Sequence, residues 1–259
     1  MIGVILAGGT GTRLKPLTNV TNKHLLHVYN RPMIDYPLST ILSTGTKNIK
    51  IVSGGEHLEA IYKYLGSGDN YNVRFSYYVQ EQAGGIAQAL SSIEEDVREG
   101  DKLMVILGDN IIEDNISKKV LKFENKSKGA HLFLKKIPKN RLYEMNKGVY
   151  RTKYAMAELD KVNRVINVVE KPIKPKTNYV VTGIYLFDNS VFDKIKRLKP
   201  SFRGEYEITD VIQQYINQSD INSSFLNGYW LDAGGSIDDL VDDSVKLRKR
   251  PPKTIKILK

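Results

Sequence analysis

Residues 2–13 read Ile2-Gly3-Val4-Ile5-Leu6-Ala7-Gly8-Gly9-Thr10-Gly11-Thr12-Arg13, an apolar run that leads directly into a glycine-rich turn. The apolar run predicts a buried strand, because it consists of aliphatic residues and ends at glycines. In α/β proteins the turn after such a strand lies at the carboxyl edge of the sheet, where ligands bind. This stretch therefore predicts an α/β fold and directs the search for a ligand site to the ends of its strands.

The first half of the chain alternates between short apolar runs and longer amphipathic segments, which is the pattern of successive βα units. We expect strands at residues 2–7, 49–53, 73–79 and 103–107. We expect helices near residues 34–43, 58–65, 86–96 and 116–124. The predicted result is a mostly parallel central sheet with helices on both faces, a Rossmann-like arrangement.

From residue 130 onward, strand-like runs follow one another without helices between them, which predicts a smaller antiparallel portion. The expected strands are residues 131–134, 155–159, 165–170 and 179–187, and the expected helices lie near 191–198, 208–216 and 237–247. Neither a linker nor a repeat divides the sequence, so we expect a single domain over residues 1–259. Within it we distinguish residues 1–128, 129–235 and 236–259, the last being a C-terminal helix with a basic, solvated tail.

The composition excludes several kinds of site. The chain has no cysteine and four histidines, so disulfides, thiolate metal sites and cysteine nucleophiles are excluded and little room is left for zinc. Lys and Arg number 39 against 29 Asp and Glu, and the net charge of +10 favours polyanionic partners. We find no nucleic-acid reader module, no signal peptide and no apolar run near the roughly 20 residues that span a bilayer. We therefore expect a cytoplasmic protein whose partners are neither nucleic acid nor membrane.

Two cations accompany the glycine-rich turn, Arg13 within it and Lys23 beyond it. Glycines let backbone N–H groups approach phosphate oxygens, and two cations would neutralise a triphosphate. The turn is not a G-x-G-x-x-G motif, because Leu14 stands in the third glycine position, and the chain has no Gly-Lys pair for a Walker A loop. A surface turn with incidental basic residues is the alternative, but the two cations favour phosphate binding.

Two aspartates are candidate metal ligands. Asp109 follows the apolar run 104–107 at the predicted carboxyl edge of the sheet, where a carboxylate has no role in the core. Mg²⁺ prefers oxygen ligands and needs only one or two carboxylates together with phosphate oxygens. Asp232, which precedes Ala233-Gly234, is the natural second ligand. The alternatives are a turn or N-cap role for Asp109 and a helix N-terminal role for Asp232.

Taken together, these motifs resemble those of the sugar-1-phosphate nucleotidylyltransferases, and most closely the short-form glucose-1-phosphate thymidylyltransferases. The glycine loop continues into Pro16-Leu17-Thr18 and is followed by Asn22-Lys23-His24-Leu25-Leu26. The other matching segments follow in the same order over most of the chain: Gln80 with 84–89, 108–110, Glu170-Lys171-Pro172 with Pro175, 181–185, 203–210 and 230–234. Seven segments in one order are far more specific than any single motif.

The resemblance implies transfer of a nucleotidyl group from a pyrimidine nucleoside triphosphate, dTTP, to a hexose-1-phosphate, glucose-1-phosphate. Mg²⁺ is the implied cofactor and pyrophosphate the second product. The implied catalytic residues are Arg13, Lys23 and Lys171. The implied nucleotide-binding residues are Leu6, Gly8, Gly9, Gly11, Thr12, Gln80, Gly85 and Asp109. The implied sugar-binding residues are Asn110, Glu170, Lys171 and Thr182, and the implied metal ligands are Asp109 and Asp232.

Chemistry supports part of this assignment. The Gln80 amide offers both a donor and an acceptor, which matches the imide edge of thymine or uracil. A turn glutamine is the alternative, and we expect Gln88 on a helix surface. Pro172 ends the preceding strand, so Lys171 could hold the sugar phosphate and Glu170 the sugar hydroxyls. An exposed pair of charges at a strand end is the alternative there.

Two departures from the family pattern leave the substrate open. His27 stands where the family has a proline. Ala155 stands where the family has a glycine that gives the sugar access to backbone, and it follows an extra stretch at 141–152. The alternatives are therefore UTP in place of dTTP, another sugar-1-phosphate, or a catalytically inactive subunit for nucleotide-sugar sensing or assembly. The oligomeric state, a homo-oligomer included, is also left open.

Overall fold

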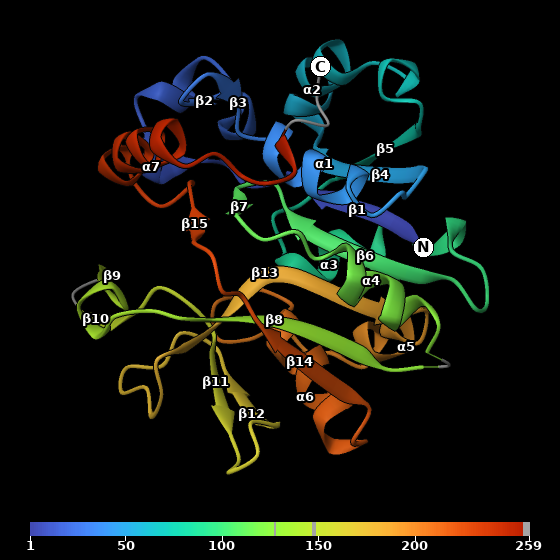
Figure 1. Ribbon diagram of the computed structural model, residues 1–259, viewed down its shortest axis with the longest axis vertical. Coiled ribbons are helices and arrows are strands. Elements are labelled where there is room, and N and C mark those ends of the chain that lie inside the picture. The colour runs from blue at the N-terminus through green and yellow to red at the C-terminus, as the bar shows by residue number, and fades with distance from the viewer. Residues whose placement is uncertain (127, 147–148, 256–259) are drawn as a thin grey trace.

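A computed structural model describes residues 1–126, 128–146 and 149–255 of the chain. Its centre is a sheet with the strand order β12-β11-β13-β6-β1-β4-β5, to which β8 and β14 add beside β13 (Figure 1). In the first half, four strands run parallel: β1 (Ile2–Leu6), β4 (Asn48–Gly54), β5 (Arg74–Gln80) and β6 (Lys102–Leu107). The predicted parallel sheet is confirmed.

Helices cover both faces of the sheet, because successive side chains of a strand point to opposite sides. Val4 and Leu6 of β1 belong to a buried cluster shared with three helices, α3 (Ile86–Ser91), α5 (Val191–Lys196) and α6 (Ile208–Asn217). Ile5 belongs to a cluster on the other face, shared with α1 (Asp35–Leu42), α2 (Gly55–Leu65) and α4 (Ser117–Glu124). Burying one such side chain contributes about 1.5–3 kcal/mol, so burial on both faces fixes β1 and the turn that follows it.

The second half of the chain extends the same sheet. β13 (Tyr179–Asp188) pairs antiparallel with β6 and with β8 (Ala130–Lys136). β11 (Met156–Leu159) and β12 (Val165–Val169) continue the antiparallel order outward, so the predicted antiparallel portion is confirmed. A further strand, β14 (Ile221–Phe225), pairs parallel with β8. The sequence did not indicate it, because its middle residues are polar.

The described residues also form three two-stranded sheets. These are β2 (His27–Val28) with β3 (Arg31–Pro32), β9 (Tyr143–Asn146) with β10 (Val149–Thr152), and β7 (Asn110–Ile112) with β15 (Trp230–Asp232). The extra stretch at 141–152 therefore contains the β9–β10 hairpin. The β7–β15 pair places Asp232 opposite Asn110, directly after the end of β6.

Some helix ends differ from the predicted ones. α2 begins at Gly55, directly after β4. α3 ends at Ser91, and a separate 3₁₀ turn at Glu94–Asp96 follows where one longer helix was expected. None of the helices in the described part of the chain is both long and apolar enough to cross a membrane.

The C-terminal segment packs against the body of the protein as far as residue 255, which corrects the expectation of a solvated tail there, and residues 256–259 lie outside the described residues. After α7 (Ile237–Lys249), Pro252 and Thr254 are buried. Arg250 Nε lies 2.6 Å from Glu113 Oε1, and the Lys253 N–H donates to the Glu113 carbonyl at 3.2 Å. The basic residues that suggested a solvated terminus are interspersed with the side chains that make the buried contacts.

Candidate active site

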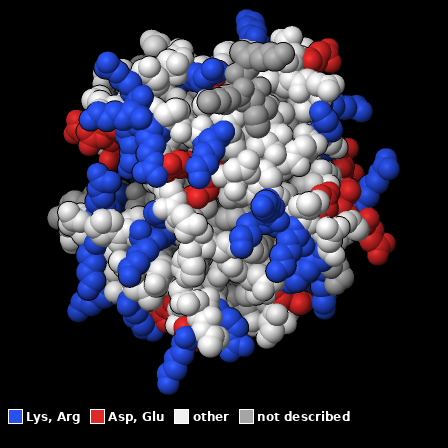
Figure 2. Space-filling model, viewed as in Figure 1, with Lys and Arg blue, Asp and Glu red and all other residues white. Residues whose placement is uncertain are grey.

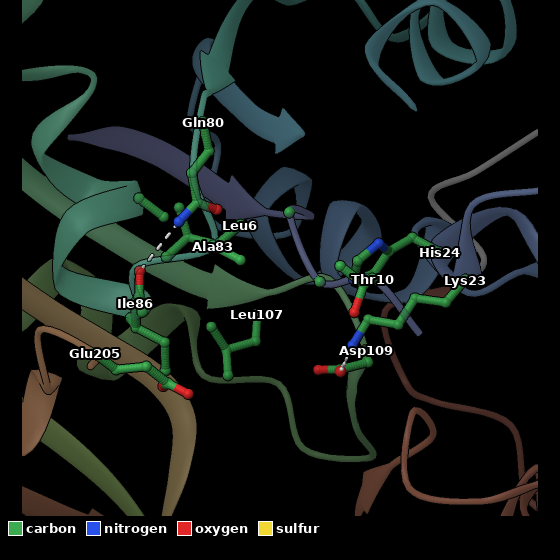
Figure 3. Close-up of a pocket in the computed structure, with 14 residues that line it drawn as sticks. Leu6, Thr10, Lys23, His24, Gln80, Ala83, Ile86, Leu107, Asp109 and Glu205 are labelled. Atoms are coloured by element: carbon green, nitrogen blue, oxygen red, sulfur yellow. Dashed lines mark hydrogen bonds and ion pairs between the residues drawn. The ribbon is translucent and has the colours of Figure 1, made fainter. Parts of the chain in front are cut away.

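Two pockets adjoin at the carboxyl edge of the parallel strands. The glycine-loop pocket, of about 270 Å³, includes Leu6, Gly8, Gly9, Lys23, Gln80 and Gly85 among its lining residues (Figure 3). The Glu170 pocket, of about 180 Å³, includes Arg13, Asn110, Glu170, Lys171 and Asp232. Asp109 lines both pockets. Most of the side chains singled out in the sequence therefore meet at one place.

The glycines of the turn make room for neighbouring side chains. A side-chain carbon at Gly8 would overlap the Gln80 amide, and one at Gly9 would lie 2.9 Å from Lys23 Cε. Gly11 has a φ of 66°, which glycine adopts without strain, and it precedes the 3₁₀ turn Thr12–Leu14 that carries Arg13. Gly11 and Thr12 are not among the described residues that line either pocket, so their contact with the nucleotide stays a prediction.

Asp109 and Asp232 both line the Glu170 pocket, and Asp109 also lines the glycine-loop pocket. The β7–β15 pair holds them together, because the Ala233 N–H donates to the Asp109 carbonyl at 3.0 Å. Lys23 Nζ lies 2.5 Å from Asp109 Oδ2. Gly234 permits this approach, since a side-chain carbon there would be 2.7 Å from the same oxygen. The two carboxylates therefore share one small, charged region.

The pKa values of the two carboxyl groups are moved apart. Burial, and secondly the negative charge of Asp109, raise the pKa of Asp232 to about 6. Burial alone would also raise the pKa of Asp109, but the adjacent Lys23 ammonium helps to hold it below its usual value. Two like charges in one buried site behave in this way, because the ionised form of one disfavours that of the other.

The two carboxylates suit a hard divalent cation. They supply oxygen atoms, and a cation between them would remove the repulsion that contributes to the raised pKa of Asp232. In the part of the chain that the structure describes, there is no cluster of three His, Cys, Asp or Glu that could hold a metal. A cation here would therefore need further oxygens from water or from a bound phosphate.

The other end of the glycine-loop pocket is formed by Gln80, the last residue of β5, and by Gly85. Gln80 Nε2 donates to the Gly85 carbonyl at 3.3 Å and to Gln88 Oε1 at 2.8 Å. Gln88 was expected on a helix surface. Instead it is half-buried and hydrogen-bonded to the side chain proposed to read the base.

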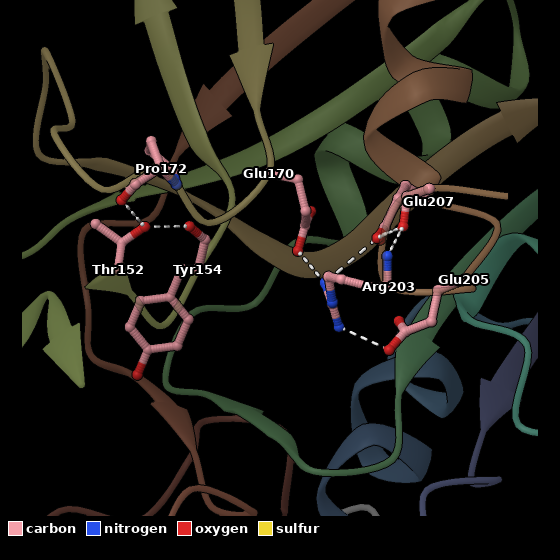
Figure 4. Close-up of polar contacts among 8 residues, drawn as sticks. Thr152, Tyr154, Glu170, Pro172, Arg203, Glu205 and Glu207 are labelled. Atoms are coloured by element: carbon pink, nitrogen blue, oxygen red, sulfur yellow. Dashed lines mark hydrogen bonds and ion pairs between the residues drawn. The ribbon is translucent and has the colours of Figure 1, made fainter. Parts of the chain in front are cut away.

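In the Glu170 pocket one arginine contacts three carboxylates (Figure 4). Arg203 Nη1 lies 3.2 Å from Glu170 and 3.4 Å from Glu207, and its Nη2 lies 2.7 Å from Glu205. Burial, and secondly Glu207, raise the pKa of Glu170, while Lys171 and Arg203 act in the opposite direction. Glu205 lines both pockets, so Arg203 connects a carboxylate of one pocket with a carboxylate of the other.

Lys171 lines the Glu170 pocket from a turn of unusual conformation. Its φ of 40° is in the left-handed region, which is uncommon for residues other than glycine. The carbonyl of the next residue, Pro172, accepts hydrogen bonds from the N–H and the Oγ1 of Thr152, both at 3.1 Å. The end of the β9–β10 hairpin therefore holds the turn that carries Lys171.

Asn110 lines the Glu170 pocket and also connects three strands. Its Oδ1 accepts from the Gly183 N–H at 3.0 Å and from Trp230 Nε1 at 2.6 Å, and its Nδ2 donates to Asp109 Oδ1 at 3.0 Å. Ala155, which stands in the position of the family glycine, lines the same pocket. The departure from the family pattern therefore lies at the pocket wall.

Thr182 is the one predicted sugar-binding residue that the described structure does not bring to the pocket. Its side chain is buried and donates to the Phe133 carbonyl at 2.7 Å. Val181 and Gly183, its neighbours on β13, line the Glu170 pocket. Because side chains alternate along a strand, Thr182 faces the other side of the sheet.

Sequence reasoning missed several side chains at the site. Arg203 and Glu205 lie in a segment that supported the resemblance, but no role was derived for them. Tyr154 and Trp230 both line the Glu170 pocket and contact each other edge to face, with ring centroids 5.0 Å apart. The sequence held a signal for both, because Tyr154 directly precedes Ala155 and Trp230 stands two residues before Asp232.

A model of the nucleotidyl transferase family matches residues 2–250. The chain belongs to this family. The match confirms the resemblance seen in the motifs, and it covers both halves of the sheet and the β7–β15 pair.

Individual relatives agree with this family. A glucose-1-phosphate thymidylyltransferase from Mycolicibacterium smegmatis is 38% identical over 94% of this chain and 81% of that protein. A crystal structure from Bacillus anthracis, described as a candidate glucose-1-phosphate thymidylyltransferase in complex with a sucrose, has a TM-score of 0.86, 40% identity and 99% coverage of both chains. The crystal structure of UDP-glucose pyrophosphorylase with UDP-glucose shows the same fold, with a TM-score of 0.81 at 21% identity and coverage of 96% and 98%. The predicted fold is confirmed.

Proposed function

We propose that this protein transfers a thymidylyl group from dTTP to glucose-1-phosphate, giving dTDP-glucose and pyrophosphate, with Mg²⁺ as cofactor. The observation that carries the proposal is the position of Asp109, which lines both pockets, with Asp232 near it in the Glu170 pocket. One pocket is bounded by a glycine-rich turn, and the other contains Lys171 and Glu170. The names of the relatives at 34–38% identity support the choice of substrates.

The proposed reaction needs no general base, because the sugar phosphate is already ionised near neutral pH. One of its oxygens forms a bond to the α-phosphorus of the triphosphate. The bond from that phosphorus to the bridging oxygen breaks, and the electron pair leaves with pyrophosphate. Catalysis then consists of positioning the two reactants and neutralising their charge.

Each proposed role follows from a position in the two pockets. Lys171 directs the sugar phosphate, and Glu170 accepts hydrogen bonds from sugar hydroxyls. Arg13 and Lys23 stabilise the charge of the triphosphate and of the leaving group. Asp109 and Asp232 would hold Mg²⁺, which supplies positive charge to the phosphate oxygens.

The decisive experiment is a panel of nucleoside triphosphates against hexose-1-phosphates, with pyrophosphate release as the readout, with and without Mg²⁺. We expect dTTP with glucose-1-phosphate to be turned over fastest, and only when Mg²⁺ is present. Faster turnover with UTP would change the base, and faster turnover with another sugar phosphate would change the acceptor. Absence of pyrophosphate release with every pair would favour a catalytically inactive subunit.

Binding to nucleic acid is a weaker alternative. Figure 2 shows that basic side chains on the face in view form separate groups among uncharged and acidic residues, without one continuous stripe. A gel shift at moderate salt tests this alternative, because binding by charge alone weakens steeply as ionic strength rises.

A further inference from the structure

Gln88 folds back over the turn from which its own helix starts. The turn contains Gly84 and Gly85, and α3 begins at Ile86. The Gly84 N–H donates to Gln88 Oε1 at 3.0 Å. A backbone N–H can only donate, so the atom of the Gln88 amide that faces it must be the oxygen.

The same oxygen determines the orientation of the Gln80 amide. Gln80 Nε2 lies 2.8 Å from Gln88 Oε1 and 3.3 Å from the carbonyl oxygen of Gly85. Both partners are acceptors, so the group between them must be the NH₂ of Gln80. Both hydrogens of this NH₂ group are then bonded within the protein. The orientation of the Gln80 amide therefore depends on two backbone groups of the glycine turn, the Gly84 N–H and the Gly85 carbonyl.

The carbonyl oxygen of Gln80 is left to face the glycine-loop pocket. It lies against Gly8, where a side-chain carbon would overlap it, and Gly8 lines the pocket. Figure 3 shows the amide nitrogen of Gln80 turned toward the start of α3 and the oxygen turned away from it, toward the first strand. The pocket therefore presents a hydrogen-bond acceptor at this position.

We propose that Gln88 is a specificity-determining positioning residue, which holds Gln80 as an acceptor and so selects bases with an N3–H donor. Thymine and uracil carry that donor. Cytosine has a lone pair at N3, which would face the Gln80 oxygen without a hydrogen between them. A rotated Gln80 amide would reverse the preference. This inference rests on the proposed function, because it assigns the base of the triphosphate to this end of the pocket.

The test compares Gln88→Leu with Gln88→Glu, and measures kcat/KM for dTTP and for CTP with glucose-1-phosphate. Leucine has no acceptor, so the Gln80 amide can rotate, and we expect the preference for dTTP over CTP to fall by about tenfold to a hundredfold. Glutamate keeps an acceptor for both Gly84 and Gln80, so the preference should stay within about threefold of the parent. The Gly84 N–H also has the Gln82 carbonyl at 2.8 Å, so Gln88→Leu leaves it with a partner.

A matched control and a second readout separate the possible outcomes. Ser92→Ala, an exposed position just after α3, should leave the preference unchanged. Equilibrium binding of dTTP and CTP to the same proteins measures the base preference without turnover. A similar loss of kcat/KM or of affinity for both triphosphates in Gln88→Leu would overturn the inference, because a merely structural role lowers both. If the parent binds dTTP over CTP but turns over neither, the proposed function fails while the role of Gln88 is still measured.

Discussion

At the scale of single residues, the carboxylate pair determines what the site can do. The Asp232 carboxylate has a raised pKa because it is buried beside a second negative charge. We expect Asp232→Asn to fold normally, since an amide of the same shape removes the repulsion. We expect it to lower Mg²⁺-dependent turnover by about 10²–10³, the usual loss when one electrostatic contact to a reacting phosphate is removed. Pyrophosphate release and thermal unfolding measure the two effects.

The control for this variant is Asp238→Asn, an exposed aspartate in the first turn of α7. It should retain both parental turnover and parental stability. Unchanged Mg²⁺-dependent turnover in Asp232→Asn would remove Asp232 from the proposed metal site. A large loss of stability would show that the carboxylate supports the fold.

The role of a single residue could be predicted from the sequence where its residue type allows few functions at that position. Asp109 follows the apolar run 104–107, and a carboxylate there has no use in a core, so its place at the ligand edge could be anticipated. Asp232 is the last residue of β15, a strand that the sequence did not indicate, and only the resemblance implied its role. Gln88 and Arg203 could not be assigned in this way. Their partners, Gln80 and Glu170, are brought to them by a loop, and side-chain periodicity does not specify loop contacts. For Thr182 the alternation along β13 did hold the answer, since Val181 and Gly183 face the pocket.

At the scale of elements, the loop before α6 connects the two pockets through Arg203. The guanidinium contacts three carboxylates at once, and a lysine cannot reproduce that forked geometry. We expect Arg203→Lys to raise KM for both dTTP and glucose-1-phosphate by about tenfold, with a smaller change in kcat. Steady-state kinetics in each substrate measures this. The exposed Arg197→Lys is the matched control, and unchanged KM values in Arg203→Lys would show that the three contacts do not position substrate groups.

The surroundings of His131 on β8 make stability depend on pH. His131 on β8 lies 3.0 Å from Ser224 Oγ on β14, and its surroundings include Lys119, Lys122 and Lys126. Burial, and secondly these lysines, lower the pKa of His131 to about 4. The unfolded chain therefore takes up this proton first. The stability that depends on a neutral His131 is complete above about pH 6.5 and is lost as the pH falls toward 4.

We expect His131→Gln to reduce this loss. Between pH 7 and pH 4.5 the parent should lose about 1–3 kcal/mol more of its free energy of unfolding than the variant does. Urea unfolding at the two pH values measures the difference. The exposed His27→Gln should behave like the parent. Equal losses in the parent and in His131→Gln would contradict the burial of a neutral histidine at this position.

The order of helices and strands was the most predictable part of the fold. Short apolar runs alternate with amphipathic segments, and this pattern indicates directly which segments are buried strands and which are helices on the sheet. The predictable strands are those with buried aliphatic residues, such as β1 and β6. β7, β14 and β15 are short or polar, and they form because a partner strand lies beside them. Yet β7 and β15 bring together Asp109 and Asp232, the proposed metal ligands, so the pairing most important for the proposed chemistry is the one with the weakest sequence signal.

At the scale of the whole molecule, the chain returns at its end to the half in which it began. β15 pairs with β7, α7 contacts β2, and the segment after α7 packs beside α1, where Thr254 Oγ1 lies 3.1 Å from Ser39 Oγ. The second half is thereby attached to the first both through the central sheet and through its C-terminal end. These contacts of the C-terminal part hold β15, and with it Asp232, beside β7.

The last prediction concerns the packing of the segment after α7 against the rest of the protein. Removing residues 250–259 deletes the contacts of Arg250 with Glu113 and exposes the surface that Pro252 and Thr254 cover. We expect a loss of about 2–4 kcal/mol in the free energy of unfolding from the buried area, and so a lower Tm. Turnover at 25 °C should be retained, because residues 250–255 do not line either pocket of the site. Lys253→Ala, which leaves the main-chain hydrogen bond to Glu113 in place, is the control and should keep the parental Tm. A truncated protein with an unchanged Tm would show that the segment contributes nothing, whereas loss of turnover at an unchanged Tm would place it at the site.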